Sequence, residues 1–235
     1  MKYKFPLFRL LPIYIIVIVS LIFTAIGSSY AVTALSESAP IENRKCIIID
    51  AGHGGEDGGA VSCTGVLESQ INLEIALRLN DLLNLLGIKT VMIRKSDCSI
   101  YTQGDSIAEK KISDLKERVR IVNSTPNSIL ISIHQNQFTE SKYSGAQVFY
   151  APTNGSQALA EQLQSSLIQT LNTSSKRTSK KSDGIYLMKN IIRPGVLLEC
   201  GFLSNPEEEH KLRDSEYQKQ LCCVIASVCS NYLHG

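Results

Sequence analysis

The chain has 235 residues, of which 43% are hydrophobic and 20% are charged. This composition is typical of a globular protein, and the length allows one domain with a leader or two small domains. The formal net charge of only +2 does not favour a nucleic-acid partner. The basic run at 174–181 (SSKRTSKK) is a local exception that we interpret as a solvated loop, with contact to an anionic polymer as the minor alternative.

The N-terminus has the pattern of an export signal. Lys2, Lys4 and Arg9 precede an apolar stretch at 10–27 that carries no charge. Basic residues ahead of an apolar run are typical of exported proteins. The apolar stretch is longer than the usual core of a signal peptide and just long enough to span a bilayer. We therefore expect the rest of the chain to work outside the cytoplasm, with the basic N-terminus inside.

This segment is compatible with cleavage and equally with retention as a membrane anchor. Residues 29–31 (SYA) end in the small-x-small pattern that a signal peptidase recognises. We predict that residues 1–31 are a signal peptide or membrane anchor, that residues 32–44 are a polar linker, and that the folded domain covers 45–235.

Six apolar runs of strand length follow the linker, and helical patterns lie between several of them. Strands that alternate with helices predict a single α/β domain with a largely parallel sheet flanked by helices. Runs such as CIII and ILISI fit strands that helices cover on both faces. The strands are expected at 46–50, 88–94, 128–134, 146–151, 184–189 and 195–201.

Apolar residues that recur at intervals of three and four predict four helices. Residues 95–111 form the longest irregular stretch between elements and are predicted to be a loop at the rim of a site. The helices are expected around 67–86, 115–122, 159–171 and 221–232.

Seven cysteines in an exported chain leave at least one without a disulfide partner. Cys46 and Cys200 lie in apolar strand-like runs, and Cys222 and Cys229 lie on one face of the last helix. We interpret them as buried thiols that act as small hydrophobic side chains rather than as a disulfide framework.

Two histidines and a glutamate are the candidate metal ligands. His53 follows the first strand in a glycine-rich turn (DAGHGG), and His134 ends the third strand (ILISIH). Ligands of open α/β sheets gather at the carboxyl ends of the strands, so both imidazoles are expected at one edge. Glu68 starts the first helix and can face the same edge. Two imidazoles and a carboxylate bind zinc in many hydrolytic sites, where a fourth position stays open for water.

Each candidate ligand also has an ordinary structural interpretation when it is considered alone. The helix dipole favours a glutamate in the first turn, as at Glu68, and a lone histidine at a strand end is often a hydrogen-bonded core group. Two histidines at two strand ends favour a shared ligand role instead. Cys63 lies between His53 and Glu68 and is an alternative ligand, disfavoured because no second cysteine is spaced with it.

Glu199 is the candidate general base. It is the only charged residue of VLLECGF, so its carboxylate is expected to be buried and to need a partner. Beside a metal-activated water, such a carboxylate suits general-base catalysis, and a buried salt bridge is the alternative. Asp50, which precedes the glycine-rich turn, is predicted to hydrogen-bond near the site or to cap the turn.

With these residues assembled, the chain resembles the zinc-dependent N-acetylmuramoyl-L-alanine amidases over about 45–233. The resemblance implies that His53, Glu68 and His134 hold one zinc ion per chain and that Glu199 is the catalytic carboxylate. It also implies a twisted six-stranded sheet, and peptidoglycan as the substrate, cut at the amide between muramic acid and the first L-alanine of the stem peptide. The matching pieces are IIIDAGHGG, GVLESQINLEIALRL, IRKSD, LKERVRIVN, SILISIHQN and VLLECGFLSN.

Two positions depart from the pattern of this family, and neither removes a ligand. Gln135 stands where alanine is expected, and Ile93 replaces threonine before Arg94. A large side chain beside His134 is expected to narrow the cleft or to change the affinity for zinc. The short leader and bare catalytic domain resemble the sporulation-specific, germination-related amidases of spore-formers, which help to produce muramic-δ-lactam in the cortex.

Two other functions remain open from the sequence. A zinc carboxypeptidase acting on wall peptides would use Arg94, Arg118 or Arg193 to bind a terminal carboxylate. A non-catalytic wall-binding scaffold protein is the second alternative. Since no wall-binding module is recognised, we expect the N-terminal segment or an envelope protein partner to hold the domain near peptidoglycan, at the membrane, in the cell wall or in the forespore intermembrane space.

Overall fold

The computed structural model describes residue 18 and residues 45–234. The rest of the predicted signal or anchor segment and the linker lie outside the described residues. Within the described part of the chain, no helix combines the length and the apolar character that crossing a membrane requires. Residues 45–235 form one compact unit.

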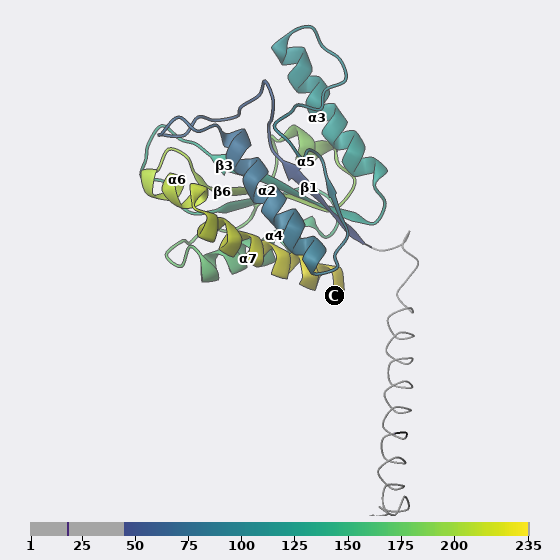
Figure 1. Ribbon diagram of the computed structural model, residues 1–235, viewed down its shortest axis with the longest axis vertical. Coiled ribbons are helices and arrows are strands. Elements are labelled where there is room, and N and C mark those ends of the chain that lie inside the picture. Colours follow the sequence, from purple (N-terminus) through teal and green to yellow (C-terminus); the bar gives the residue numbers. More distant parts are fainter. Residues whose placement is uncertain (1–17, 19–44, 235) are drawn as a thin grey trace, which may run out of the picture. The chain divides into compact units, whose positions relative to one another are not determined.

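A six-stranded sheet lies at the centre of this unit (Figure 1), with the strand order β2-β1-β3-β6-β4-β5. All neighbouring strands are parallel except β4 and β6, which are antiparallel. The predicted single α/β domain with a largely parallel six-stranded sheet is therefore confirmed. The strands are β1 Cys46–Ala51, β2 Thr90–Met92, β3 Ser128–Asn136, β4 Gln147–Tyr150, β5 Lys180–Lys181 and β6 Gly195–Phe202.

Helices cover both faces of the sheet. α2, α4 and α7 lie on one face, where α2 and α7 run side by side, and α3 and α5 lie on the other (Figure 1). The four helices predicted from apolar periodicity are confirmed as α2, α3, α4 and α7. The helices are α2 Glu68–Leu85, α3 Ile107–Ser124, α4 Ser156–Thr170, α5 Tyr186–Asn190, α6 Pro206–Arg213 and α7 Ser215–His234.

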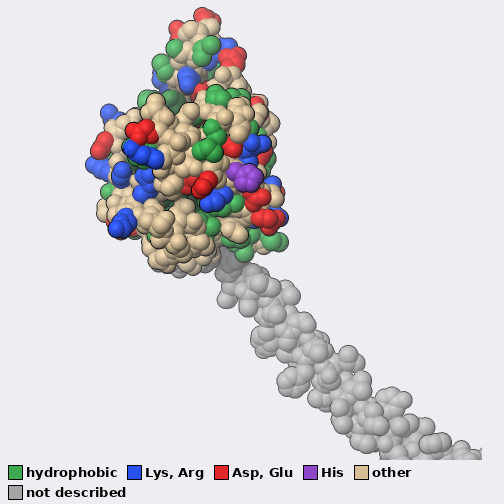
Figure 2. All heavy atoms as spheres, turned by 90° about the vertical axis from the view of Figure 1, so that its left-hand side faces the viewer, with side chains coloured by type: hydrophobic (Ala, Val, Ile, Leu, Met, Phe, Trp, Pro, Cys, Tyr) green, Lys and Arg blue, Asp and Glu red, His purple; other side chains and the backbone are tan. Residues whose placement is uncertain are grey.

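The alternation of side chains along the strands divides the core into two layers. Ile47 and Ile49 of β1 pack into the layer under α2, α4 and α7, whereas Ile48 packs with Val122 of α3 and Leu187 of α5. Because both faces are covered, the central strands are apolar without interruption, as the sequence indicated. Acidic and basic side chains are interspersed over the face shown in Figure 2, in line with the small net charge.

The strand predicted at 184–189 is wrong. Residues 186–190 form α5, which buries Leu187 and Met188 against the α3 side of the sheet. The strand that completes the six-stranded sheet is instead β5, a two-residue edge strand within the basic run at 174–181. Both of its lysines are exposed. An edge strand with exposed lysines carries no apolar signal, because its outer side must discourage pairing with other chains.

The rim loop predicted at 95–111 is shorter than expected, because α3 already begins at Ile107. Ser106 accepts a hydrogen bond from the backbone N–H of Glu109, and the Glu109 side chain bonds back to the backbone of Ser106. This reciprocal capping starts the helix two turns before Leu115, the first residue of the predicted apolar stripe.

All seven cysteines are free thiols, and Cys46, Cys200, Cys222 and Cys229 are buried. Burial raises the pKa of the Cys222 and Cys229 thiols to about 12, which keeps them protonated and unreactive. The interpretation of these four residues as small hydrophobic core groups is confirmed.

A chain truncated to begin at Lys45 is expected to fold cooperatively, because the compact unit that starts there has its own core. Thermal denaturation followed by circular dichroism checks this, and a melt without a sharp transition would count against the boundary.

Within the truncated chain, Leu79→Ala should lower the free energy of unfolding by about 2–5 kcal/mol, because Leu79 is fully buried in α2. Leu85→Ala, at an 83% exposed position of the same helix, is the matched control and should change it little.

Candidate metal centre and active site

The predicted site residues meet at the carboxyl ends of three neighbouring strands. His53 lies two residues beyond the end of β1, and His134 and Glu199 lie opposite each other in the parallel pair β3–β6. Glu68 is the first residue of α2 and reaches over the same edge. The order β1-β3-β6 in the sheet thus brings together four residues that are up to 146 positions apart in the sequence.

His53, Glu68 and His134 form a group that could hold a metal ion. Their candidate ligand atoms all lie within 4.8 Å of one another. Glu68 lies between the imidazoles, with Oε2 3.2 Å from His53 Nε2 and Oε1 3.0 Å from His134 Nδ1. These separations allow one ion to contact all three residues with bonds of about 2 Å. Cys63 is exposed and does not belong to this group.

Glycines make room for the imidazoles. A Cβ atom at Gly52 would lie 2.2 Å from the His134 ring, and a Cβ atom at Gly59 would lie 2.6 Å from Glu68 Oε2. His53 itself has a positive φ of 60°, which is uncommon for a residue with a side chain. The turn therefore has a shape that brings the His53 ring close to Glu68, and side chains at the flanking glycines would block it.

Asp57 orients His53, and our sequence reasoning did not single it out. His53 Nδ1 lies 2.9 Å from Asp57 Oδ2, so the carboxylate accepts the Nδ1 proton and leaves Nε2 facing Glu68. Asp57 also accepts from Lys111 Nζ of α3 at 3.0 Å. The available signal was a carboxylate four residues after a histidine in a glycine-rich turn, which is too common to carry a prediction by itself.

The charges of the group favour a cation. Burial opposes ionisation of Glu68, but His134 and His53 hold its pKa well below the ordinary value. Burial would also lower the pKa of His53, but the carboxylates of Asp57 and Glu68 raise it to about 9. The ionised carboxylates thus hold positive charge in the site, which a metal ion can supply in place of protons.

Glu199 lies beside the group without belonging to it. Burial raises the pKa of Glu199 to about 7, and His134 and Glu68 exert opposing effects. Its Oε2 atom is buried without a hydrogen-bond partner among the described residues. That unpartnered oxygen does not fit the alternative of a structural salt bridge, and it leaves the carboxylate available to a water or a substrate.

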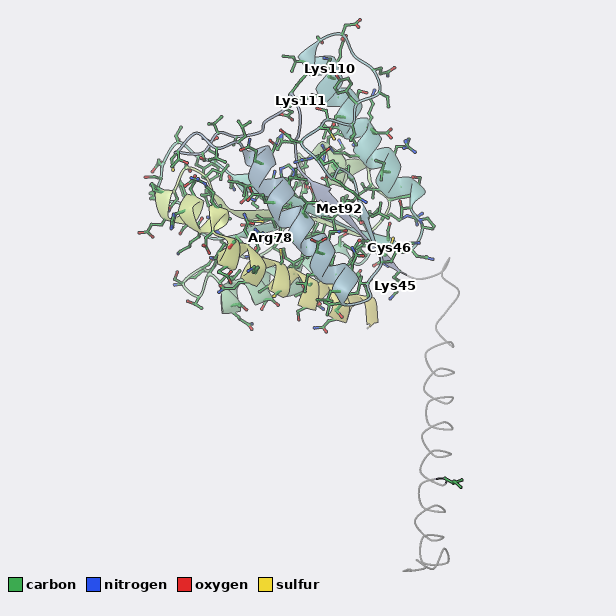
Figure 3. The ribbon with its side chains drawn as sticks, in the orientation of Figure 1. Lys45, Cys46, Arg78, Met92, Lys110 and Lys111 are labelled. Carbon is green, nitrogen blue, oxygen red and sulfur yellow. The ribbon has the colours of Figure 1, made fainter. Side chains whose placement is uncertain are left out.

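A cleft of about 290 Å³ adjoins these residues on the side of α3 and α5. His53, His134 and Glu199 form one wall, and Leu115 and Leu187 are among the apolar residues of the others. Lys110 and Lys111 lie on the first half of α3, where this helix extends past the sheet (Figure 3), and Lys111 also lines the cleft. The cleft therefore combines apolar contacts with charged groups, among them Lys111 and its ion-pair partner Asp57.

A buried ion pair between Arg118 and Asp50 supports the turn that carries His53. Arg118 of α3 donates to Asp50 at the end of β1 and to the carbonyl oxygens of Ala51 and His53, at 3.1 and 2.9 Å. Asp50 also accepts from Ser132 Oγ at 2.7 Å. Burial alone would raise the pKa of Asp50, but Arg118, His134 and Ser132 together hold it below the ordinary value.

The three arginines that were candidates for the carboxylate site of a carboxypeptidase are engaged or placed elsewhere. Arg94 is buried and donates to the carbonyl oxygens of Ala51, Gly52 and Ser69 at 2.8–3.0 Å. Arg118 is held by the contacts described above. Arg193 precedes β6 and therefore lies at the amino end of that strand, at the opposite edge of the sheet from Glu199.

Arg118→Ala is expected to lower the free energy of unfolding by about 3–5 kcal/mol, because it leaves the buried carboxylate of Asp50 without its partner. Urea denaturation measures the change. Since the folded pKa of Asp50 is depressed, this stability is present above the unfolded pKa and is lost as the pH falls through the folded value, so the difference between wild type and variant should shrink in acid. Arg120→Ala, which breaks an exposed pair with Glu117 on the same helix, is the control and should have little effect.

Comparisons with known proteins agree with this geometry. Residues 47–229 match the N-acetylmuramoyl-L-alanine amidase family. The germination-specific N-acetylmuramoyl-L-alanine amidase of Bacillus subtilis is 38% identical over 183 residues, which cover 77% of this chain and 76% of the relative. The CwlD amidase of Clostridioides difficile, solved in complex with the GerS lipoprotein, superposes with a TM-score of 0.77 at 37% identity over 81% of this chain and 99% of that one. An N-acetylmuramoyl-L-alanine amidase of Clostridium difficile 630 gives 0.71 at 30% identity over 82% and 98%. The chain belongs to the N-acetylmuramoyl-L-alanine amidase family of cell-wall hydrolases.

Proposed function

We propose that this amidase is zinc-dependent, with His53, Glu68 and His134 as the ligands and Glu199 as the general base. One observation carries the proposal: a carboxylate whose Oε2 atom is buried and unpartnered among the described residues lies beside a His–Glu–His group. The donor set of two imidazole nitrogens and one carboxylate fits zinc, and Asp57 supplies the second hydrogen bond that zinc-binding histidines usually make.

The residues of the chain divide the work of hydrolysis. Zinc, when bound, supplies Lewis-acid activation of water and of the scissile carbonyl. Glu199 accepts the proton of the attacking water and returns it to the departing amine of L-alanine. A pKa raised to about 7 by burial suits a group that must both take and release a proton near neutral pH. The cleft beside α3 holds the stem peptide, with apolar contacts from Leu115 and Leu187.

The biological setting that we propose is the envelope of a sporulating cell. The support is the similarity to the germination-specific amidase of Bacillus subtilis. Within that setting, removal of stem peptides prepares muramic acid for conversion to muramic-δ-lactam in the cortex. The N-terminal segment would export the chain and, if it is retained, anchor it, which raises the local concentration of enzyme at the wall.

An envelope protein partner is part of the same proposal. The CwlD amidase was solved as a complex with a lipoprotein, and 99% of that amidase chain is similar to this one. A partner of this kind would hold the domain near its substrate or order the rim of the site.

Mass spectrometry of peptidoglycan fragments tests the function. Incubation with the zinc-loaded chain should release stem peptides that begin with free L-alanine and leave glycan strands with intact lactyl groups. Release of C-terminal amino acids would instead identify a carboxypeptidase, and binding without any product would identify a scaffold.

His134→Ala should remove bound zinc, because the variant keeps only two of three ligands. Elemental analysis of the purified full-length chain should show one zinc per wild-type chain and much less in the variant. His210→Ala, at an exposed position of α6, should keep full zinc content. Full zinc content in His134→Ala would show that the ligands are assigned wrongly.

Glu199→Gln should lower the turnover rate by about a hundred- to ten-thousand-fold, because the amide keeps the shape of the carboxylate but cannot accept the proton. Zinc content and the circular dichroism spectrum should match those of the wild type. Glu207→Gln in α6, where the side chain is exposed, is the control for the same chemical change. Near-normal hydrolysis by Glu199→Gln would exclude the proposed base.

A further inference from the structure

Gln135 follows His134 in β3 but faces the other side of the sheet. It is 3% exposed and lies under the start of α2, and it does not line the cleft. Narrowing of the cleft, one of the two effects that we expected from a large residue here, does not occur. The remaining possibility is an effect on the metal group, and the hydrogen bonds around Gln135 provide a route for it.

The Glu68 carboxylate is held by three donors other than the imidazoles. Its Oε2 accepts from the backbone N–H of Ala60 at 2.9 Å. Its Oε1 accepts from the backbone N–H of Gln135 at 3.1 Å and from Asn72 Nδ2 at 3.2 Å. Two of these donors belong to the backbone and are fixed by the fold. Asn72 is the only one of the three whose orientation depends on a side chain.

The direction of the Asn72 amide follows from its neighbours. Asn72 is fully buried, and its Nδ2 also donates to the carbonyl oxygen of Gly52 at 3.2 Å. Because Gly52 O and the ionised Glu68 carboxylate can only accept, the NH₂ group must face them and Oδ1 must face away. Gln135 Nε2 lies 3.1 Å from that oxygen and supplies its donor. An alanine at position 135 could not do so.

The Gln135 side chain also destabilises the fold in one respect, which packing alone does not explain. Gln135 Oε1 is buried and accepts no hydrogen bond from a nitrogen or an oxygen of the described residues, and the only polar group beside this side chain apart from Asn72 is the weakly donating thiol of Cys200. A buried, unsatisfied carbonyl destabilises the fold, so an apolar side chain of similar size would suit this place better if stability were the only requirement.

We infer that Gln135 is a positioning residue for the metal group: it orients the Asn72 amide, which holds Glu68 in its ligand geometry and thereby sets the affinity for zinc. This inference rests on the proposed metal site. It assigns a role to a side chain that contacts neither the ion nor the substrate.

Gln135→Met in the full-length chain tests the inference, because methionine keeps the length of the side chain and removes the donor. The dissociation constant for zinc, measured by competition with a chromophoric chelator on the metal-free protein, should rise by about tenfold. The melting temperature of the metal-free protein should stay within about 3 °C, because the variant loses one unsatisfied oxygen, at Gln135, and gains another, at Asn72. An unchanged dissociation constant overturns the inference.

Gln164→Met is the matched control. Gln164 is also 3% exposed, but it bonds to the backbone of Ala146 and Val148, away from the metal group. It should lower the melting temperature and leave the affinity for zinc unchanged. If Gln135→Met behaved in the same way, Gln135 would be a structural residue and the inference would be overturned.

A double variant tests the route through Asn72. Asn72→Ala alone should weaken zinc binding, and adding Gln135→Met should then have little further effect, because the residue that Gln135 orients is gone. Independent, multiplicative losses would overturn the route. Failure of the wild-type chain to bind zinc at all would contradict the proposed metal site itself, which is a different outcome from normal zinc binding in the Gln135 variants.

Discussion

The buried ion pair between Asp50 and Arg118 connects the elements on which the site depends. Asp50 is the penultimate residue of β1, and Arg118 lies in the second half of α3. Ser132 of β3 donates a further hydrogen bond to the Asp50 carboxylate. Taking two charges out of water is expensive, and such a pair is stable only when further hydrogen bonds satisfy both groups. Here the remaining donors of Arg118 bind backbone carbonyls of the His53 turn and the side chain of Asp114. The pair thus determines where the first histidine lies.

The site itself concentrates negative charge at one edge of the sheet. Glu68, Asp57 and Glu199 come from a helix, a turn and a strand, and all three surround the two imidazoles. Of these three, Glu199 alone has a raised pKa, because burial opposes its ionisation and no hydrogen-bonded cation offsets that effect. Glu68 and Asp57, which contact histidine directly, have lowered pKa values. Three carboxyl groups of similar intrinsic acidity thus differ in their pKa values. Glu68 and Asp57 stay ionised and hold positive charge, whereas the pKa of Glu199 is suited to proton exchange.

Much of this could be predicted from the sequence because the signals were local. Continuous apolar runs identified the covered strands, and each candidate ligand stood at the end of a strand or the start of a helix. The failures have a common physical cause. β5 has two exposed lysines, and its place in the sheet follows from pairing with β4 rather than from its own residues. The side chain of Gln135 was expected near the cleft, yet the alternation along β3 directs it to the opposite face from His134. Both depend on neighbours that are distant in the sequence.

The reversed direction of β4 has a consequence for how this fold can diversify. β4 runs antiparallel to β6, with Gln147 opposite Glu199, and β5 runs parallel to β4. The connections that lead into β4 and β5, at 137–146 and 171–179, therefore both arrive at the end of the sheet where Glu199 lies, and Gln147 donates to the carbonyl oxygen of Thr178 there. Loops tolerate insertions better than the elements that they connect. Two segments at the same end of the sheet as Glu199 can thus lengthen or change composition without disturbing the parallel strands that precede the histidines, so selection for a new wall substrate can act on them alone.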